Sequence, residues 1–330
     1  MREKRTITIG LPVRNEEKSI SECLSSIRAA MYEADIAKDA PLVVCINGCS
    51  DNTEKLTRDF QKKFSDIRVE IIQSEEGLVN AQRKIVELYP AEIHIFPDGD
   101  NIIEAHSIKN ILSAFARDKN TVVAYARTVP IARGNRISIF GRMGHLYDEQ
   151  RMLHQRKYFH GRLFATRDWY IPKYEEIAAR ARKNAMGAHL LKYTKGTTLL
   201  YADDVFMSNY ILHTYGSNAI CQVDDAECFS FPVASLFDWW NVHRRTRIEV
   251  EKIRQWFPEY RYLNLHKKRK TDWKKWRAAP RKEKILWLLF LVMRATLSWV
   301  VKAELLCARL PWFRPSDQWK ATISTKRKHS

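Results

Sequence analysis

The chain has 330 residues, of which 45% are hydrophobic and 28% are charged, a composition that excludes a disordered or fibrous protein and allows one or two globular domains. Its net charge of +18 is concentrated at one end, since residues 241–330 hold 24 Lys and Arg against 7 Asp and Glu, whereas residues 1–240 hold 32 against 31. A near-neutral body with a strongly basic tail predicts an anionic partner such as nucleic acid, phosphate or a membrane surface.

The cysteines and the N-terminus indicate a reduced, cytoplasmic protein. Six cysteines are too few for a disulfide scaffold of this size, and the spacings of Cys45 with Cys49 and of Cys221 with Cys228 fit no common zinc site. The first five residues, Met-Arg-Glu-Lys-Arg, lead directly into a strand-like stretch without an apolar signal region. We therefore expect no secretion.

Strand and helix patterns alternate over the first 130 residues. Strands are expected at 6–11, 42–46, 67–72, 93–96 and 121–126. Helices are expected at 17–30, 79–88 and 107–116, and a further helix should end at 64 and be capped by Ser50 or Asp51. Short apolar runs separated by helices predict an α/β fold with a mainly parallel sheet that is covered on both faces. Ligands of such sheets bind at the carboxyl ends of the strands.

Polar turns follow three of the predicted strands. Residues 12–17 (Pro-Val-Arg-Asn-Glu-Glu) follow the first, residues 47–53 (Asn-Gly-Cys-Ser-Asp-Asn-Thr) the second, and Asp98-Gly99-Asp100 the fourth. Two carboxylates one residue apart suit Mg²⁺ or Mn²⁺, which completes its shell with phosphate oxygens and water. The alternative for Asp-Gly-Asp is a solvated turn. Its place at the end of an apolar strand, beside other polar strand ends, favours a binding site.

These turns resemble motifs of the family 2 glycosyltransferases, inverting enzymes with the nucleotide-sugar-binding GT-A fold. Residues 12–17 are similar to the Pro-x-x-Asn-Glu opening of that family, residues 47–53 to its Asp-Gly-Ser-Thr-Asp-Asn-Thr turn, and residues 98–100 to its metal-binding Asp-x-Asp. Residues 202–208 resemble the Glu-Asp-x-x-Leu segment that carries the catalytic base, and residues 244–248 the Gln/Arg-x-x-Arg-Trp segment of membrane-associated members. The five similarities follow the family's order.

The resemblance implies a hexosyl- or N-acetylhexosaminyltransferase that performs one in-line displacement with inversion at the anomeric carbon. It implies that Asp204 takes the proton from the acceptor hydroxyl and that Asp100 binds Mn²⁺ or Mg²⁺, with Asp98 on the metal or on the ribose. Nucleotide-sugar binding would fall to Pro12, Val13, Arg14, Glu16, Asn47, Asp98, Arg244 and Arg247, the last two neutralising the diphosphate. Asp203 is expected either to share in catalysis or to cap the helix after it.

Three positions depart from the family's pattern. Ile46 and Asn47 stand where an acidic pair is common, Asp203 stands in place of Glu, and Ile248 replaces Trp. Either Asn47 reads the uracil edge in place of a carboxylate, or the base is read less strictly. A UDP-sugar is the expected donor, and a GDP-sugar remains open.

The basic tail predicts a membrane-associating extension. We expect a catalytic domain over residues 1–240, with a nucleotide-sugar half at about 1–130 and an acceptor half at about 131–240, and a basic helical extension over 241–330. Residues 285–301 are mostly apolar, short for a span, and flanked by basic residues on both sides. They predict a membrane-interface helix over about 282–310 on an anionic leaflet. A re-entrant helix, a spanning helix and a helix packed on the body are the alternatives.

Such an anchor predicts an acceptor within the membrane. We expect a peripheral protein on the inner face of the cell membrane, with no nucleic-acid partner. Its acceptor would be a lipid or lipid-linked glycan, and its role the biosynthesis of cell-envelope polysaccharide or glycolipid. A polyprenyl-phosphate glycosyltransferase is the alternative among enzymes. A basic nucleic-acid-binding protein and an inactive glycosyltransferase-like scaffold are the alternatives from other classes.

Overall fold

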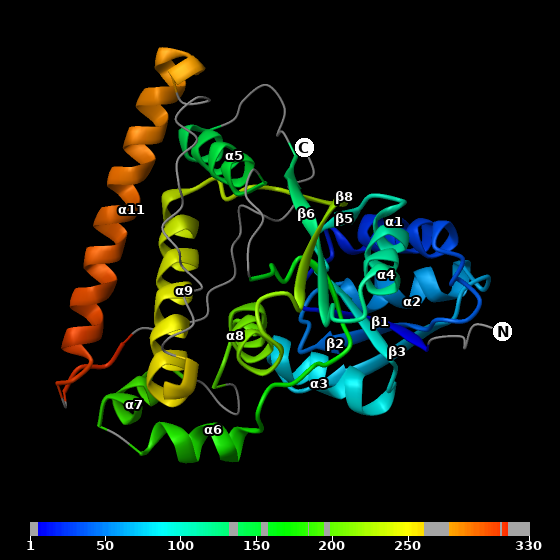
Figure 1. Ribbon diagram of the computed structural model, residues 1–330, viewed down its shortest axis with the longest axis horizontal. Helices are drawn as coiled ribbons and strands as arrows, with labels where there is room; N and C mark the ends of the chain where they lie inside the picture. Colours follow the sequence, from blue (N-terminus) through cyan, green and yellow to red (C-terminus); the bar gives the residue numbers. More distant parts are fainter. Residues whose placement is uncertain are drawn as a thin grey trace.

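A single mixed sheet forms the centre of the protein, with a pair of long helices at one end (Figure 1). The computed structural model describes residues 6–131, 138–152, 158–183, 185–194, 199–260, 277–310 and 312–315. The strand order is β3-β2-β1-β4-β7-β6-β8-β5. The pairs β3–β2, β2–β1, β1–β4 and β6–β8 are parallel, so the predicted α/β fold with a mainly parallel sheet is confirmed.

The first half of the chain follows the predicted alternation. Strands and helices succeed one another as β1 (Ile7–Val13), α1 (Ile20–Glu33), β2 (Leu42–Asn47), α2 (Thr53–Lys63), β3 (Val69–Ser74), α3 (Leu78–Leu88), β4 (Ile93–Pro97), α4 (Ser107–Arg117) and β6 (Val123–Pro130). The cap predicted for α2 was placed too early, because its N-cap is Asn52. Asp51 still accepts a hydrogen bond from the Thr53 N–H at 3.0 Å, so its carboxylate satisfies a helix donor from one residue further out.

Two antiparallel insertions complete the sheet. Strand β7 (Leu163–Thr166) lies between β4 and β6 and runs against both. The two-residue β5 (Ile102–Ile103) pairs with the end of β8 (Ile220–Ser230). Because β7 runs antiparallel to β4 and its Leu163 pairs with Pro97, the segment before β7 lies at the carboxyl end of β4.

Alternate residues of the strands pack on opposite faces of the sheet, as the two-residue period of a strand requires. Ile9, Leu11 and Leu42 face one core, which α1, α2 and α4 cover. Val43 and Phe96 face a second core, which contains α3, α8 (Asp203–Tyr215) and part of α9 (Leu236–Trp256). The sheet therefore leaves its strand ends, rather than its faces, for the site.

The C-terminal helices form a layer beside the second core. Helix α9, drawn in yellow in Figure 1, lies between the body and α11 (Arg281–Cys307), and α11 also contacts α5 (Ile139–Met152). The short helices α6 (Tyr174–Ala181), α7 (Ala185–Leu190) and η2 (Pro258–Tyr260) contact α9, and η1 (Leu191–Tyr193) contacts α7. Helix α9 continues across residue 240, and the division into a catalytic domain and an extension at that point stays a prediction.

Candidate active site

The turns after β1 and β2 are held together by hydrogen bonds between their backbones and side chains. The Glu16 N–H donates to Thr53 Oγ1 at 2.7 Å, and the Ser50 N–H donates to Asn15 Oδ1 at 2.8 Å. Asn15 makes this possible by adopting a left-handed conformation, with φ of 53°, which Asn tolerates better than most residues. The first two predicted motifs thus form one surface at the carboxyl ends of neighbouring strands.

The residues predicted to bind the nucleoside lie on or beneath this surface. Asn47 is buried at the end of β2, where its Oδ1 accepts a hydrogen bond from the Gly77 N–H at 2.7 Å. Arg14 forms an ion pair with Glu76 at 2.8 Å. Pro12 and Val13 are buried within β1. The structure brings these residues to one end of the sheet, and their contacts with a nucleotide remain predictions.

The Asp98-Gly99-Asp100 turn packs directly against the turn after β1. A Cβ atom at Gly99 would lie 3.1 Å from Val13 Cγ1 and 3.2 Å from Glu16 Cγ, so the close approach favours glycine. On its other side the turn is fixed by the Asp98 N–H, which donates to the Arg162 carbonyl oxygen at 2.9 Å. The predicted metal motif and the predicted nucleotide motif therefore share one wall.

Asp203 and Asp204 begin helix α8 and enter the same region. Asp203 is buried and accepts a hydrogen bond from Gln82 Nε2 at 2.6 Å. Asp204 accepts one from the Gly161 N–H at 3.3 Å. The N-cap of α8 is Ala202, so the alternative that Asp203 caps this helix is wrong; its side chain is directed to α3 instead.

Four carboxylates act on one another in this cluster, which we call the acidic cluster: Asp98, Asp100, Asp203 and Asp204. Burial raises the pKa of Asp98 well above its usual range, and the neighbouring Asp100, Asp203 and Asp204 carboxylates raise it further. Burial, followed by the Asp204 carboxylate, raises the pKa of Asp203 to about 7. Like charges held this close disfavour simultaneous ionisation. The arrangement costs stability unless a cation is bound there.

Two arginines that were not predicted as site residues face the acidic cluster. The Arg162 guanidinium opposes the rise in the pKa of Asp98, and it also donates a hydrogen bond to Ser230. Burial lowers the pKa of Arg245, and the carboxylates of Asp204, Glu249 and Asp98 oppose that shift. Residues 161–165, which include Arg162, resemble a cleft-lining stretch of the family, but this resemblance is too unspecific to assign Arg162 a role. Arg245 lies within the predicted arginine motif, but its direction depends on the rotation of α9.

Arg244 and Arg247 contact α11 from the other face of α9, and their predicted contact with the diphosphate stays a prediction. Arg244 is buried in a bidentate ion pair with Glu304 of α11, with nitrogen–oxygen distances of 2.7 and 2.5 Å. Arg247 donates to Ser298 Oγ at 3.3 Å, and His243 Nε2 lies 2.9 Å from the same oxygen. Residues 243 and 247 are one helical turn apart and share a face, whereas Arg245 points away from it.

The donor set of the acidic cluster fits a hard divalent cation. Asp98 and Asp100 offer oxygen ligands, and the four carboxyl groups of the cluster face two guanidinium groups, so the cluster carries an excess of negative charge when all four are ionised. Among the residues that the structure describes, no three His, Cys, Asp or Glu side chains gather closely enough to hold a metal alone. Mg²⁺ commonly takes one or two protein carboxylates together with substrate phosphates. The residues present fit such shared binding.

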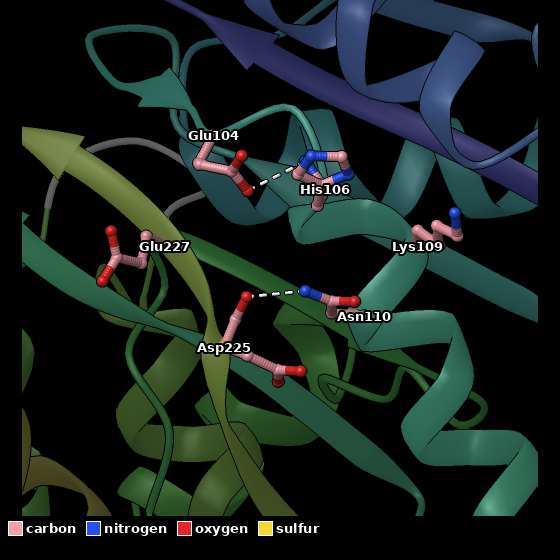
Figure 2. Close-up of a pocket in the computed structure, with 6 residues that line it drawn as sticks. All are labelled: Glu104, His106, Lys109, Asn110, Asp225 and Glu227. Carbon is pink, nitrogen blue, oxygen red and sulfur yellow. Dashed lines mark hydrogen bonds between the residues drawn. The ribbon is translucent and has the colours of Figure 1, made fainter.

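A separate cavity of about 430 Å³ lies between α4 and β8 (Figure 2). It is lined by Glu104, His106, Lys109, Asn110, Asp225 and Glu227. Asn110 is occupied by a hydrogen bond from its Nδ2 to the Asp225 carbonyl oxygen, and Glu104 accepts one from the His106 N–H. None of the predicted site residues lines this cavity, which makes its side chains useful controls.

Comparison with known proteins places these observations in a family. Residues 8–179, more than half of the chain, match the family model described as Glycosyl transferase family 2. The glycosyltransferase AglE of Haloferax volcanii is 29% identical over 94 residues, which are 28% of this chain and 30% of that protein. The match thus spans less than a third of that relative's length.

Solved structures share the fold. The mannosyltransferase PcManGT from Pyrobaculum calidifontis, solved in complex with GDP-Man and Mn²⁺, superposes with a TM-score of 0.51 at 17% identity, over 92% of this chain and 76% of that one. Glucosyl-3-phosphoglycerate synthase from Mycobacterium tuberculosis superposes with a TM-score of 0.45 at 16% identity, over 77% of this chain and 80% of that one. The first likeness confirms the predicted GT-A fold.

Proposed function

The chain belongs to glycosyl transferase family 2, and on that premise we propose that it transfers a sugar from a nucleoside-diphosphate sugar to a hydroxyl group of a membrane lipid or lipid-linked glycan. It is a glycosyltransferase by family; the donor, the acceptor and the metal are the proposed part. A UDP-sugar is the first candidate donor, and the GDP-Man complex of the similar mannosyltransferase keeps a GDP-sugar in the comparison.

The observation that carries the proposal is the acidic cluster facing Arg162 and Arg245. Its carboxylates come from the end of β4 and from the start of α8, which are about one hundred residues apart in the chain. Placing like charges together without a ligand is unfavourable, and a cation bound with a diphosphate would remove the penalty. A purely structural role gives no reason for such an excess.

Each residue of the site has a proposed part in the reaction. Asp100 binds Mn²⁺ or Mg²⁺ directly, and Asp98 completes the metal site or holds the ribose. Pro12, Val13, Arg14, Glu16 and Asn47 line the nucleoside pocket. Arg245, in place of Arg244 and Arg247, neutralises the diphosphate, because its planar guanidinium matches phosphate oxygens and stays protonated.

The proposed reaction is one displacement with inversion. Asp204 accepts the proton of the acceptor hydroxyl as its oxygen attacks the anomeric carbon from the face opposite the diphosphate, a step typically worth about 10²–10⁴-fold. The bond between the anomeric carbon and the diphosphate oxygen breaks, and the nucleoside diphosphate leaves with the electron pair. A divalent cation would supply positive charge that stabilises this leaving group.

Helix α11 supports the proposal of a membrane acceptor because it is apolar on both of its sides. Its inner side packs Phe290 and Leu286 against Met143 and Trp239. Its outer side exposes large apolar side chains, among them Val292 at 65% and Trp299 at 71%. Only 11% of its most apolar 18-residue window is buried. A continuous exposed apolar face of this kind is typical of contact with a membrane or a partner.

We place the chain at the inner face of the cell membrane, with α11 in the interface. Arg281 and Lys282 are exposed at the start of the helix, where they would meet anionic head groups. Trp299 and Trp312 are amphipathic side chains that favour the interface. The role expected from this location is cell-envelope polysaccharide or glycolipid synthesis.

A panel of nucleotide sugars tests the donor and the metal together. The full-length chain is heated with each UDP- and GDP-sugar, with and without Mn²⁺ or Mg²⁺, and both its melting temperature and donor hydrolysis are followed. One donor class should stabilise the protein only when metal is present. Asp100→Ala should lose this response, whereas Asp225→Asn, in the cavity of Figure 2, should keep it. Absence of any metal-dependent response would count against the proposed function.

Flotation with vesicles tests the membrane contact. The chain should bind vesicles that contain phosphatidylglycerol more strongly than neutral ones, and Val292→Glu with Trp299→Glu should weaken binding at least tenfold. Leu88→Glu is the control, because Leu88 is also an exposed apolar residue, at 54%, but lies on α3. Release by carbonate would favour an interfacial helix, and resistance to it a spanning one. If neither the wild type nor the variant with Val292→Glu and Trp299→Glu floats with the vesicles, the proposed location is contradicted.

A further inference from the structure

Helix α9 carries a fully buried ion pair next to the acidic cluster. Glu249 and Lys252 each have 0% exposure, and Lys252 Nζ lies 3.0 Å from Glu249 Oε1. Removing two charges from water is costly, and apolar residues of similar volume often replace such a pair without loss of stability. Stability alone therefore gives no reason for these two residues, and their other bonds indicate what they do.

Both side chains hold the same stretch of backbone, residues 199–202, which belongs to no helix or strand. Lys252 Nζ donates to the Leu199 carbonyl oxygen at 3.0 Å. Glu249 Oε2 accepts from the Tyr201 N–H at 2.8 Å and from the Ala202 N–H at 3.4 Å. The ammonium group also lies 4.8 Å from the centre of the Tyr201 ring. The charged pair thus replaces the hydrogen bonds that a regular element would supply.

This stretch leads directly into the two aspartates of α8. Ala202 is the N-cap of that helix, and Asp203 and Asp204 are its first two residues. Gln82 holds Asp203 from α3, and the Gly161 N–H holds Asp204 from the segment before β7. With Glu249 and Lys252 on the remaining side, the start of α8 is fixed from three directions.

The same face of α9 also presents Arg245. Residues 245, 249 and 252 are spaced four and three apart, which places them along one side of a helix. A single rigid helix therefore sets the position of a guanidinium and of a carboxylate relative to each other. Small displacements of reacting groups, of about 1 Å, can cost about 10²-fold in rate.

We propose that Glu249 and Lys252 are positioning residues, which hold the backbone of residues 199–202 so that the Asp204 carboxylate meets the acceptor hydroxyl at its working distance from Arg245. The inference rests on the proposed function, since it takes Asp204 as the proton acceptor. It adds two residues that touch neither the donor nor the acceptor.

The decisive variant is the apolar replacement Glu249→Leu with Lys252→Met. It removes the hydrogen bonds of both side chains to residues 199–202 without leaving an unpaired buried charge. We expect kcat to fall about 10²-fold, while the KM for the donor and the Kd of the nucleoside diphosphate with Mn²⁺ change less than twofold. Glu249→Gln, which keeps an acceptor for the Tyr201 N–H, should recover most of the lost kcat. Glu251→Gln is the control on the same helix, since Glu251 pairs with Arg254 near the surface.

A kcat within twofold of the wild type in the folded double variant would overturn the proposal. If that double variant does not fold, Glu249→Gln with Lys252→Met decides, because it removes the bond to Leu199 and leaves no buried charge. Unchanged kcat then overturns the proposal, and a fall in kcat without a change in donor KM supports it. Loss of donor affinity in parallel with kcat would also overturn it, because that pattern indicates general damage to the site.

Amide hydrogen exchange separates this proposal from the proposed function. Peptides covering residues 199–206 should exchange at least tenfold faster in the double variant than in the wild type, and at the wild-type rate in Glu251→Gln. If no nucleotide sugar is turned over but exchange is faster in the double variant, the proposed function is wrong, whereas the positioning role of Glu249 and Lys252 is supported. If turnover is normal and exchange is unchanged, the positioning role is wrong, whereas the proposed function is supported.

Discussion

The acidic cluster and the contact between α9 and α11 both bury charged side chains, but they balance them differently. At the strand ends, four carboxylates face Arg162 and Arg245, and burial raises the pKa of Asp98. Between the helices, Arg244 and Glu304 pair one to one, with side chains that are 5% and 13% exposed. An excess of like charge indicates a ligand that restores the balance, whereas a matched pair indicates docking of one helix on another.

Helix α9 takes part in both regions through opposite faces. Arg245, Glu249 and Lys252 are on the face toward the acidic cluster, and His243 and Arg247 are on the face toward α11. Substitutions on the first face should therefore change the reaction, and substitutions on the second should change stability. The following predictions test this division.

The largest effect is expected at Asp204. Asp204→Asn keeps the size of the side chain but removes its ability to accept a proton, so kcat should fall about 10³-fold. Nucleoside diphosphate binding with Mn²⁺, measured by calorimetry, should stay within threefold of the wild type. Asp225→Asn serves as the control. Full turnover by Asp204→Asn would favour the polyprenyl-phosphate acceptor, because a phosphate nucleophile needs no base.

On the other face of α9, Arg244→Met should reduce stability rather than the rate of the chemical step. The substitution leaves Glu304 partly buried without its partner, which should cost about 3 kcal/mol of unfolding free energy. Urea unfolding measures this, and Arg244→Met with Glu304→Leu should recover most of the loss. If the single variant kept its stability and lost donor binding instead, the division of α9 into two faces would be wrong.

The next effect comes from comparing Arg245 with Arg247, which are two residues apart in the chain and lie on opposite faces of α9. Arg245→Gln should lower kcat/KM about 10²-fold, since a positive charge near the developing diphosphate charge is lost. Arg247→Gln should lower it less than threefold, because Arg247 is exposed and bonds Ser298. Steady-state kinetics with the best donor measures both. The reverse order would restore the assignment of the diphosphate to Arg247.

The location of the polar residues at the strand ends could be predicted largely from the sequence. Buried parallel strands produce short apolar runs, and their polar ends are separate motifs, so Asp98, Asp100, Glu16 and Asn47 could be assigned to one edge. The family model matches residues 8–179, where these signals lie. Their roles remain predictions, but their convergence was foreseeable because parallel strands end at the same edge of a sheet.

The contacts of Arg162, α9 and α11 could not be predicted to the same degree, since they depend on the packing of distant segments. Arg162 reaches the acidic cluster only because β7 inserts antiparallel between β4 and β6. Which arginine of residues 244–247 faces the cluster depends on the rotation of α9, which periodicity alone leaves open. Hydropathy marked α11 as apolar, but not that Ser298 and Glu304 would face α9 rather than solvent.

The smallest effect concerns the pH dependence of the contact between α9 and α11. Burial, followed by the charges of Arg247 and Arg294, lowers the pKa of His243 to about 4. The unfolded chain binds a proton at this histidine near pH 6.5, whereas the folded protein resists it until about pH 4, so the stabilisation is complete above pH 6.5 and is lost as the pH falls toward 4. By about pH 5 the loss should amount to about 2 kcal/mol. Urea unfolding of His243→Gln across this range should show a shallower decline than the wild type, whereas His106→Gln, at an exposed position, should show the same decline. If unfolding free energy declines equally in the wild type and in His243→Gln, then His243 takes up its proton without weakening the contact with Ser298. The pairing of α9 with α11 would then rest on Arg244 and Glu304.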